Sequence, residues 1–137
     1  MKEIAVQDRK QSGEFKSYRD LIAWQKAMDL SVHVMSLTSQ FPREELYGLS
    51  QQIRKAAVSV PSNIAEGWGR GSTPDYIRFL RIARGSLCEI ETQLLIAVRM
   101  NYLKPDMIVP AVALSEECSR VLQGLIYSLE RYMNKAT

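Results

Sequence analysis

Apolar residues recur at intervals of three or four along most of the chain, the spacing typical of amphipathic α-helices. Four segments follow it: residues 18–39, 42–67, 73–101, and a last one from 105 or 110 to 133. No window alternates strictly between apolar and polar residues, as a half-buried strand would. The pattern therefore predicts an all-α fold, an antiparallel up-down-up-down four-helix bundle over residues 18–134. Residues 1–17 and 135–137 are expected to form loosely ordered tails.

Pro61 lies inside the second segment, where its ring should clash with the carbonyl of Ala57 and remove one backbone hydrogen bond. The apolar phase nevertheless continues from Val60 to Ile64 and Trp68. A turn would normally reset that phase, so the sequence favours a helix kinked near Pro61 over two separate helices.

The stretch SVPSNIAEGWGRGS, residues 59–72, raises the question of a phosphate-binding glycine loop. Such loops normally follow a strand and often place a lysine on the phosphates, whereas this stretch follows a helix and contains no GKS or GKT. We therefore predict a corner between two helices, in which the glycines permit a turn that most side chains would strain. The expected corner residues are Pro61, Asn63, Glu66, Gly67, Gly69 and Gly71. Ser72 or Thr73 should cap the next helix, with Pro74 at its first position.

Composition places the chain among ordinary folded proteins, with 46% hydrophobic and 24% charged residues. The N-terminus lacks the apolar core of a signal peptide, and no segment approaches the ~18 apolar residues of a membrane span. Cys88 and Cys118 lie in apolar helical sequence, which favours two buried thiols in a reducing compartment over a disulfide. We expect a cytoplasmic protein that is not bound to a membrane.

Positive charge is concentrated in the middle of the chain. The formal net charge is +3, and the segment from residue 54 to 84 has six basic residues against two acidic ones. Those basic residues are Arg54, Lys55, Arg70, Arg78, Arg81 and Arg84. The last three are spaced three apart and form a ridge along one helix. Such a ridge can neutralise phosphates without reading bases, although a solvated helix face has the same pattern.

Catalytic and metal-binding patterns are absent from the sequence. His33 is the only histidine, which argues against both a di-iron site with paired Glu-x-x-His units and a Ser-His-Asp triad. Glu89 and Glu91 are two positions apart and cannot face one site from the same helix. We therefore expect one of these two glutamates to face inward. It should join a structural hydrogen-bond network at the corner between the second and third helices, near Glu66. The candidate partners are Asn63, Arg70 and Ser86. No catalytic residue, cofactor or metal is predicted.

Three segments resemble the bacterial 23S rRNA intervening-sequence proteins, also called four-helix bundle proteins. They are DLIAWQKAMDL, FPREELYGLSQQIRKAAVSVPSNIAEGWGR and FLRIARGSLCEIETQLLIA, within residues 18–103. Lys55 stands where the family's central motif usually begins with arginine. The resemblance implies a small helical bundle that assembles as a ring-shaped homopentamer. It also implies kinship with the accessory variability proteins of diversity-generating retroelements, which bind nucleic acid and associate with a reverse transcriptase.

Two functions of different classes follow. The leading hypothesis is a non-enzymatic, oligomeric bundle that binds structured RNA or RNA/DNA through its basic face with little sequence specificity. Helices one and four also carry more apolar residues than one stripe needs, which favours burial against other chains. The alternative is a protein-interaction scaffold, or an accessory subunit for a reverse transcriptase, in which the basic face docks a partner.

Overall fold

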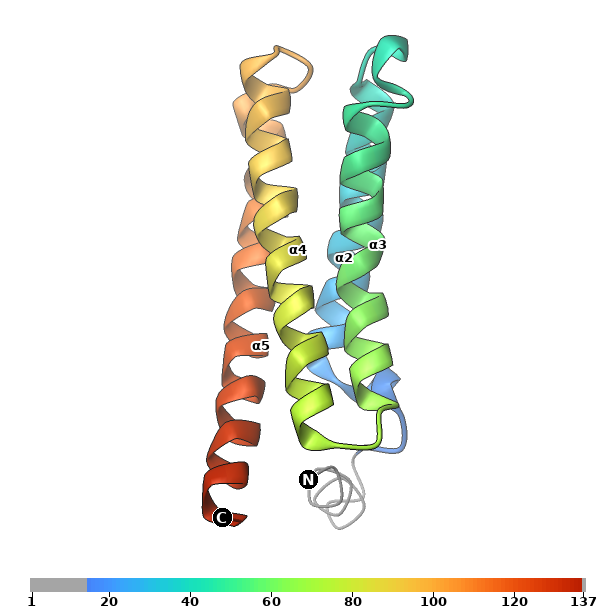
Figure 1. Ribbon diagram of the computed structural model, residues 1–137. Helices are drawn as coiled ribbons and strands as arrows, with labels where there is room; N and C mark the ends of the chain where they lie inside the picture. Colours follow the sequence, from blue (N-terminus) through green and yellow to red (C-terminus); the bar gives the residue numbers. More distant parts are fainter. Residues whose placement is uncertain (1–14, 137) are drawn as a thin grey trace.

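The computed structural model describes residues 15–136. Four long helices lie side by side, and successive helices are joined at alternate ends (Figure 1). They are α2 (Ile22–Leu37), α3 (Leu49–Trp68), α4 (Thr73–Arg99) and α5 (Val109–Ala136). Four short 3-10 helices flank them: η1 (Tyr18–Asp20), η2 (Thr38–Gln40), η3 (Arg43–Glu45) and η4 (Pro105–Ile108). The all-helical class is confirmed, and residues 15–136 contain no strand.

All four long helices contribute to one hydrophobic core. α3 packs against α2 and α4, and α5 packs against the same two helices. Leu30, Ile53, Leu80, Leu94 and Leu122 are fully buried in this core. Burial of one such side chain stabilises a fold by about 1.5–3 kcal/mol. The apolar stripes of the sequence therefore correspond to faces that meet at one centre.

The second helix begins later than its sequence pattern indicates. Instead of starting near Pro42, the chain forms η3, and α3 starts only at Leu49 after a non-helical Gly48. The Glu45 carboxylate accepts the Leu49 backbone N–H at 3.0 Å and the Tyr102 hydroxyl at 2.7 Å. These two hydrogen bonds lower the pKa of Glu45, the bond from Leu49 more strongly. A carboxylate three residues before Gly48 thus caps the helix.

Helix α3 continues through Pro61, which is buried. Val60 and Ile64 on either side are fully buried, so the core stripe passes the proline as predicted. The bend near Pro61 stays a prediction.

The chain ends differ from the expected tails. Helix α5 continues to Ala136, so Lys135 and Ala136 are helical, and Thr137 lies outside the described residues. The expected N-terminal tail lies outside them up to residue 14. Ser17 belongs to the start of η1, where its hydroxyl accepts the Arg19 N–H at 3.1 Å.

Candidate nucleic-acid interface

The corner between α3 and α4 holds the two helices close together. A Cβ atom on Gly67 would lie 2.9 Å from Cβ of Phe79 and 3.1 Å from Cδ1 of Tyr76. Only glycine fits there without displacing a neighbour. Ser72 begins α4 as its N-cap, and its hydroxyl accepts the Asp75 N–H at 3.3 Å. The predicted corner therefore exists, and its closest contact is at Gly67.

The other two corner glycines do not have the strained backbone that we expected. Gly69 is the C-cap of α3 with an ordinary right-handed helical conformation, at φ −79°. Gly71 does not adopt a left-handed conformation, and open space surrounds the position of a Cβ atom. The expectation of strain at these two positions is wrong, because the chain turns without positive φ angles.

Two arginines at this corner stack against one aromatic ring. The Arg70 guanidinium carbon lies 4.7 Å from the centroid of the Phe79 ring, and that of Arg78 lies 4.5 Å from the same centroid. The two guanidinium groups are therefore within about 9 Å of each other. Phe79 is only 9% exposed, so it provides a fixed support. We call Arg70 and Arg78 the arginine pair.

Each member of the arginine pair also has an acidic neighbour. Arg70 pairs with Glu66 at 3.0 Å and Arg78 with Asp75 at 3.7 Å, and each of the four side chains is about half exposed. Exposed ion pairs of this kind contribute about 0–1 kcal/mol. A phosphate can therefore compete for these guanidinium groups at small cost.

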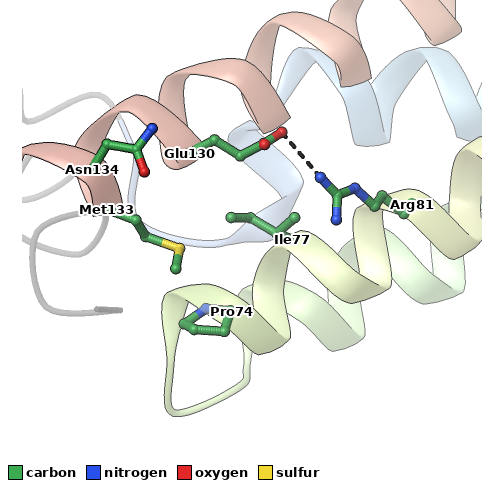
Figure 2. A pocket seen from close by; sticks show the side chains of 6 residues that line it. All are labelled: Pro74, Ile77, Arg81, Glu130, Met133 and Asn134. Carbon is green, nitrogen blue, oxygen red and sulfur yellow. Dashed lines mark ion pairs between the residues drawn. The ribbon is translucent and has the colours of Figure 1, made fainter.

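Arg81 is directed toward a different helix. Its guanidinium forms an ion pair with Glu130 of α5 at 3.1 Å (Figure 2). The pair borders a hollow of about 240 Å³ between α4 and α5, together with Ile77 and Met133. Arg84 is half-buried. The predicted ridge of three arginines is thus divided, since Arg78 joins the α3–α4 corner and Arg81 the α4–α5 side.

Arg54 and Lys55 are exposed but distant from the corner. They precede Arg70 by 16 and 15 positions, which is about 24 Å along a helix at 1.5 Å per residue. Lys55 borders a separate cleft between α3 and α4. The six predicted basic residues therefore do not form one compact patch.

The hydrogen-bond network between α3 and α4 contains no glutamate. Asn63 Nδ2 donates to the Ser59 carbonyl at 2.8 Å and to Ser59 Oγ at 2.9 Å. Ser59 Oγ in turn lies 2.8 Å from Ser86 Oγ. Glu66 and Glu89 are exposed and Glu91 is half-buried. The expectation of an inward-facing glutamate is wrong, because serine and asparagine already satisfy one another.

The remaining reactive side chains do not form a site. Cys118 is buried, whereas Cys88 is exposed, so the expectation that both thiols are buried is wrong for Cys88. His33 is half-buried. Among residues 15–136, no cluster of three or more histidine, cysteine or acidic side chains could hold a metal ion. No helix in the same range is both long and apolar enough to cross a bilayer.

The chain is similar to a known protein family and to solved structures. A family model described as 23S rRNA-intervening sequence protein matches residues 19–124. A solved structure from Bacteroides thetaiotaomicron VPI-5482, of a protein with unknown function from the S23 ribosomal protein family, has a TM-score of 0.71. It is 24% identical and covers 77% of this chain and 98% of its own, so this likeness supports the fold alone. No curated protein matches the sequence.

Proposed function

Because the chain belongs to the 23S rRNA-intervening sequence protein family, we propose that it is a non-enzymatic, oligomeric helical bundle that binds structured RNA. Binding uses charge rather than base recognition, so it has little sequence specificity and extends to RNA/DNA duplexes. The family name connects it with rRNA, and we place it accordingly in the bacterial cytoplasm.

The arginine pair is the observation that carries this proposal. Phe79 supports both guanidinium groups at the end of the bundle, and planar guanidinium groups bind phosphates through paired hydrogen bonds. The support reduces the side-chain freedom that each arginine loses on binding. Arg54, Lys55, Arg81 and Arg84 add longer-range attraction for the backbone.

The proposal takes the four helices in antiparallel up-down-up-down order, with α3 bent near Pro61. This arrangement presents the α3–α4 corner at one end of the molecule, where an RNA backbone can approach it. Residual dipolar couplings measured along α3 test the bend, and a single straight axis for residues 49–68 would contradict it.

Assembly into a homo-oligomer is part of the proposal, and the family resemblance makes a ring-shaped pentamer the expected form. Exposed apolar side chains support it, since such surface on a small bundle is commonly buried against another chain. They lie on α2, as the sequence indicated, and on α4 more than on α5, the other helix that the sequence singled out. On α4 they are Ile82, Leu95 and Ile96, and Met100 directly follows the helix. A ring would repeat the arginine pair around one axis and so multiply weak phosphate contacts.

A binding assay with a fluorescent structured RNA at low salt tests the proposal. We expect association by the wild-type chain and loss of affinity of about tenfold or more in the double variant Arg70→Gln/Arg78→Gln. Arg120→Gln, an exposed arginine on α5, is the matched control and should leave binding nearly unchanged. No association by the wild type, or equal affinities for the double variant and the control, would refute the proposal.

A second candidate function is a protein-interaction scaffold, including an accessory subunit for a reverse transcriptase. The ion pairs of Arg70, Arg78 and Arg81 favour it, because charges with partners attract phosphates less strongly than free ones. Affinity purification followed by nuclease treatment separates the two candidates. Recovery of a protein partner without nucleic acid would favour the scaffold.

A further inference from the structure

The outward face of α5 carries an exposed aromatic ring. Tyr127 is 63% exposed, and in the described part of α5 the only other exposed large hydrophobic side chain is Val109, at the start of the helix. Gly124 lies three residues before Tyr127, and open space surrounds the position where a Cβ atom of Gly124 would lie. Because long side chains of a helix lean toward its N-terminus, the ring extends along this open position. The ring is therefore accessible to a flat ligand.

Arg131 supports the same ring from the following turn. Its guanidinium carbon lies 5.8 Å from the centroid of the Tyr127 ring, within the range of a cation–π contact. Among residues 15–136, an arginine also lies over the rings of Tyr18 and Phe79. Tyr18 is half-buried, however, and Phe79 is only 9% exposed. Tyr127 thus combines a supporting arginine with a ring that a ligand can reach.

The charge beside the ring is positive. Arg131 forms no ion pair within the described residues, in contrast to both members of the arginine pair. The neighbouring carboxylate of Glu130 is engaged by Arg81 at 3.1 Å. Lys135 lies one turn beyond Arg131 and is exposed. A phosphate next to the ring would therefore meet a guanidinium group that no carboxylate occupies.

From these features we infer that Tyr127 and Arg131 form a stacking site for an unpaired base of a single-stranded nucleic acid. The base stacks on the accessible part of the Tyr127 ring, and Arg131 binds an adjacent phosphate. Every base has a flat π face, so the stacking site does not read sequence. Arg120 lies seven positions before Tyr127, about 10 Å along the helix, and is not part of the site.

The surroundings of the ring favour a nucleic acid over a protein as its ligand. Gln123, Gly124 and Asn134 lie near Tyr127 on the outward face of α5 and are exposed. None of them offers a large apolar side chain, whereas the core of a protein interface is largely apolar. A single ring in polar, positively charged surroundings matches the flat base and charged backbone of a nucleotide.

The stacking site goes beyond the proposed function. The arginine pair lies at the α3–α4 corner and binds the backbone of paired and unpaired RNA alike. The stacking site lies on α5 and needs a base that is not already stacked within a duplex. RNA with a single-stranded segment should therefore make a contact that a perfect duplex cannot make.

Titration of the full chain with a short oligouridylate that contains 2-aminopurine tests the inference, because stacking quenches the fluorescence of this base. We expect the wild type to quench it. Tyr127→Ala should remove most of the quenching and weaken binding about tenfold. Tyr127→Phe should retain both, since a phenyl ring also stacks. Tyr47→Ala is the matched control, because Tyr47 is 85% exposed and no arginine among the described residues lies over its ring.

The phosphate contact has its own readout. Arg131→Gln should reduce the magnitude of the slope of log Kobs against log salt concentration by about 0.7 for the single strand. Circular dichroism verifies that each variant is folded. Absence of quenching by the wild type would overturn the inference. So would equal binding by Tyr127→Ala and the wild type, or an equal loss in Tyr127→Phe or Tyr47→Ala.

A perfect RNA duplex separates this inference from the proposed function. Tyr127→Ala should leave duplex binding unchanged, whereas Arg70→Gln/Arg78→Gln should weaken it. If duplex binding depends on the arginine pair but Tyr127→Ala does not affect the single strand, only the stacking site is refuted. If Tyr127→Ala weakens single-strand binding while the arginine variant binds the duplex as the wild type does, only the role of the arginine pair is refuted.

Discussion

Gly67 shows how a single residue positions the candidate interface. Its missing side chain lets the end of α3 touch Tyr76 and Phe79 of α4. Phe79 in turn supports both guanidinium groups of the arginine pair. The close approach of two helices and the placement of two charges therefore depend on one small residue.

Replacement of Gly67 by alanine should destabilise the fold. Alanine gains about 0.5–1 kcal/mol in a helix, but insertion of a methyl group into a packed contact costs typically about 1–3 kcal/mol. Since one neighbour is the Tyr76 carbonyl oxygen, 3.2 Å from the Cβ position, the contact cannot relax easily. We expect a net loss of about 1 kcal/mol in chemical denaturation. Gly71→Ala, with open space around it, should change stability by less than about 0.5 kcal/mol.

The two cysteines should differ strongly in reactivity. Burial raises the pKa of the Cys118 thiol to about 11, whereas Cys88 is exposed. The thiolate is the reactive form, and at pH 8 it is only about a thousandth of a group with that pKa. A chromogenic disulfide reagent should therefore titrate one thiol per chain quickly and the second only after unfolding. Two equal fast phases in the native protein would contradict this burial.

At the scale of the elements, the start of α3 depends on a distant residue. Glu45 caps the helix while Tyr102, which follows α4, donates to the same carboxylate from 57 positions away. The Tyr102 ring also lies 5.8 Å from that of Phe41. These contacts join the loop before α3 to the loop after α4.

Stability should fall in acid partly because of this cap. The pKa of Glu45 is lowered in the folded state, as is that of Glu117, which pairs with Lys26. A carboxylate with a depressed folded pKa stabilises the fold above its unfolded value, near 4.5, and this contribution is lost as pH falls through the folded pKa. Glu45→Gln should lower stability at pH 7 and flatten the decrease below pH 4.5 in thermal melts. An unchanged pH profile would exclude Glu45 as a contributor.

Sequence alone predicted the four helices because each carries an apolar stripe that repeats every three or four residues. It also predicted Ser72 and Pro74 at the start of α4, since those signals are local. The start of α3 was missed because Glu45 and Tyr102 meet only in the folded chain. The arginine ridge was misplaced for the same reason: its partners, Phe79 and Glu130, are set by packing rather than by spacing. A phenylalanine directly after Arg78 was the one available signal.

At the scale of the whole molecule, the positive charge and the exposed apolar surface favour two different kinds of binding partner. The net charge of +3 attracts polyanions, while exposed apolar side chains on α2 and α4 favour contact with other chains. The proposed ring satisfies both, because it buries apolar surface and gathers several arginine pairs.

Light scattering at micromolar concentration tests the assembly. Five copies of the 15.6 kDa chain are expected. Ile82 and Ile96 are exposed and lie 14 positions apart, which places them on the same face of α4. The double variant Ile82→Asp/Ile96→Asp should therefore shift the mass toward that of a monomer, while Ser128→Asp on α5 should not. A monomeric wild-type protein would contradict the proposal.

The most direct test of the central claim is the salt dependence of RNA binding. For a single-stranded or structured RNA held by phosphate contacts, log Kobs falls linearly with log salt concentration, with a slope of about −0.7 to −0.9 per contact. Loss of Arg70 and Arg78 should reduce the magnitude of that slope by about 1.4–1.8 per chain. Arg120→Gln should retain the wild-type slope. A slope near zero for the wild type, or one that the double variant leaves unchanged, would show that the arginine pair does not bind the RNA backbone.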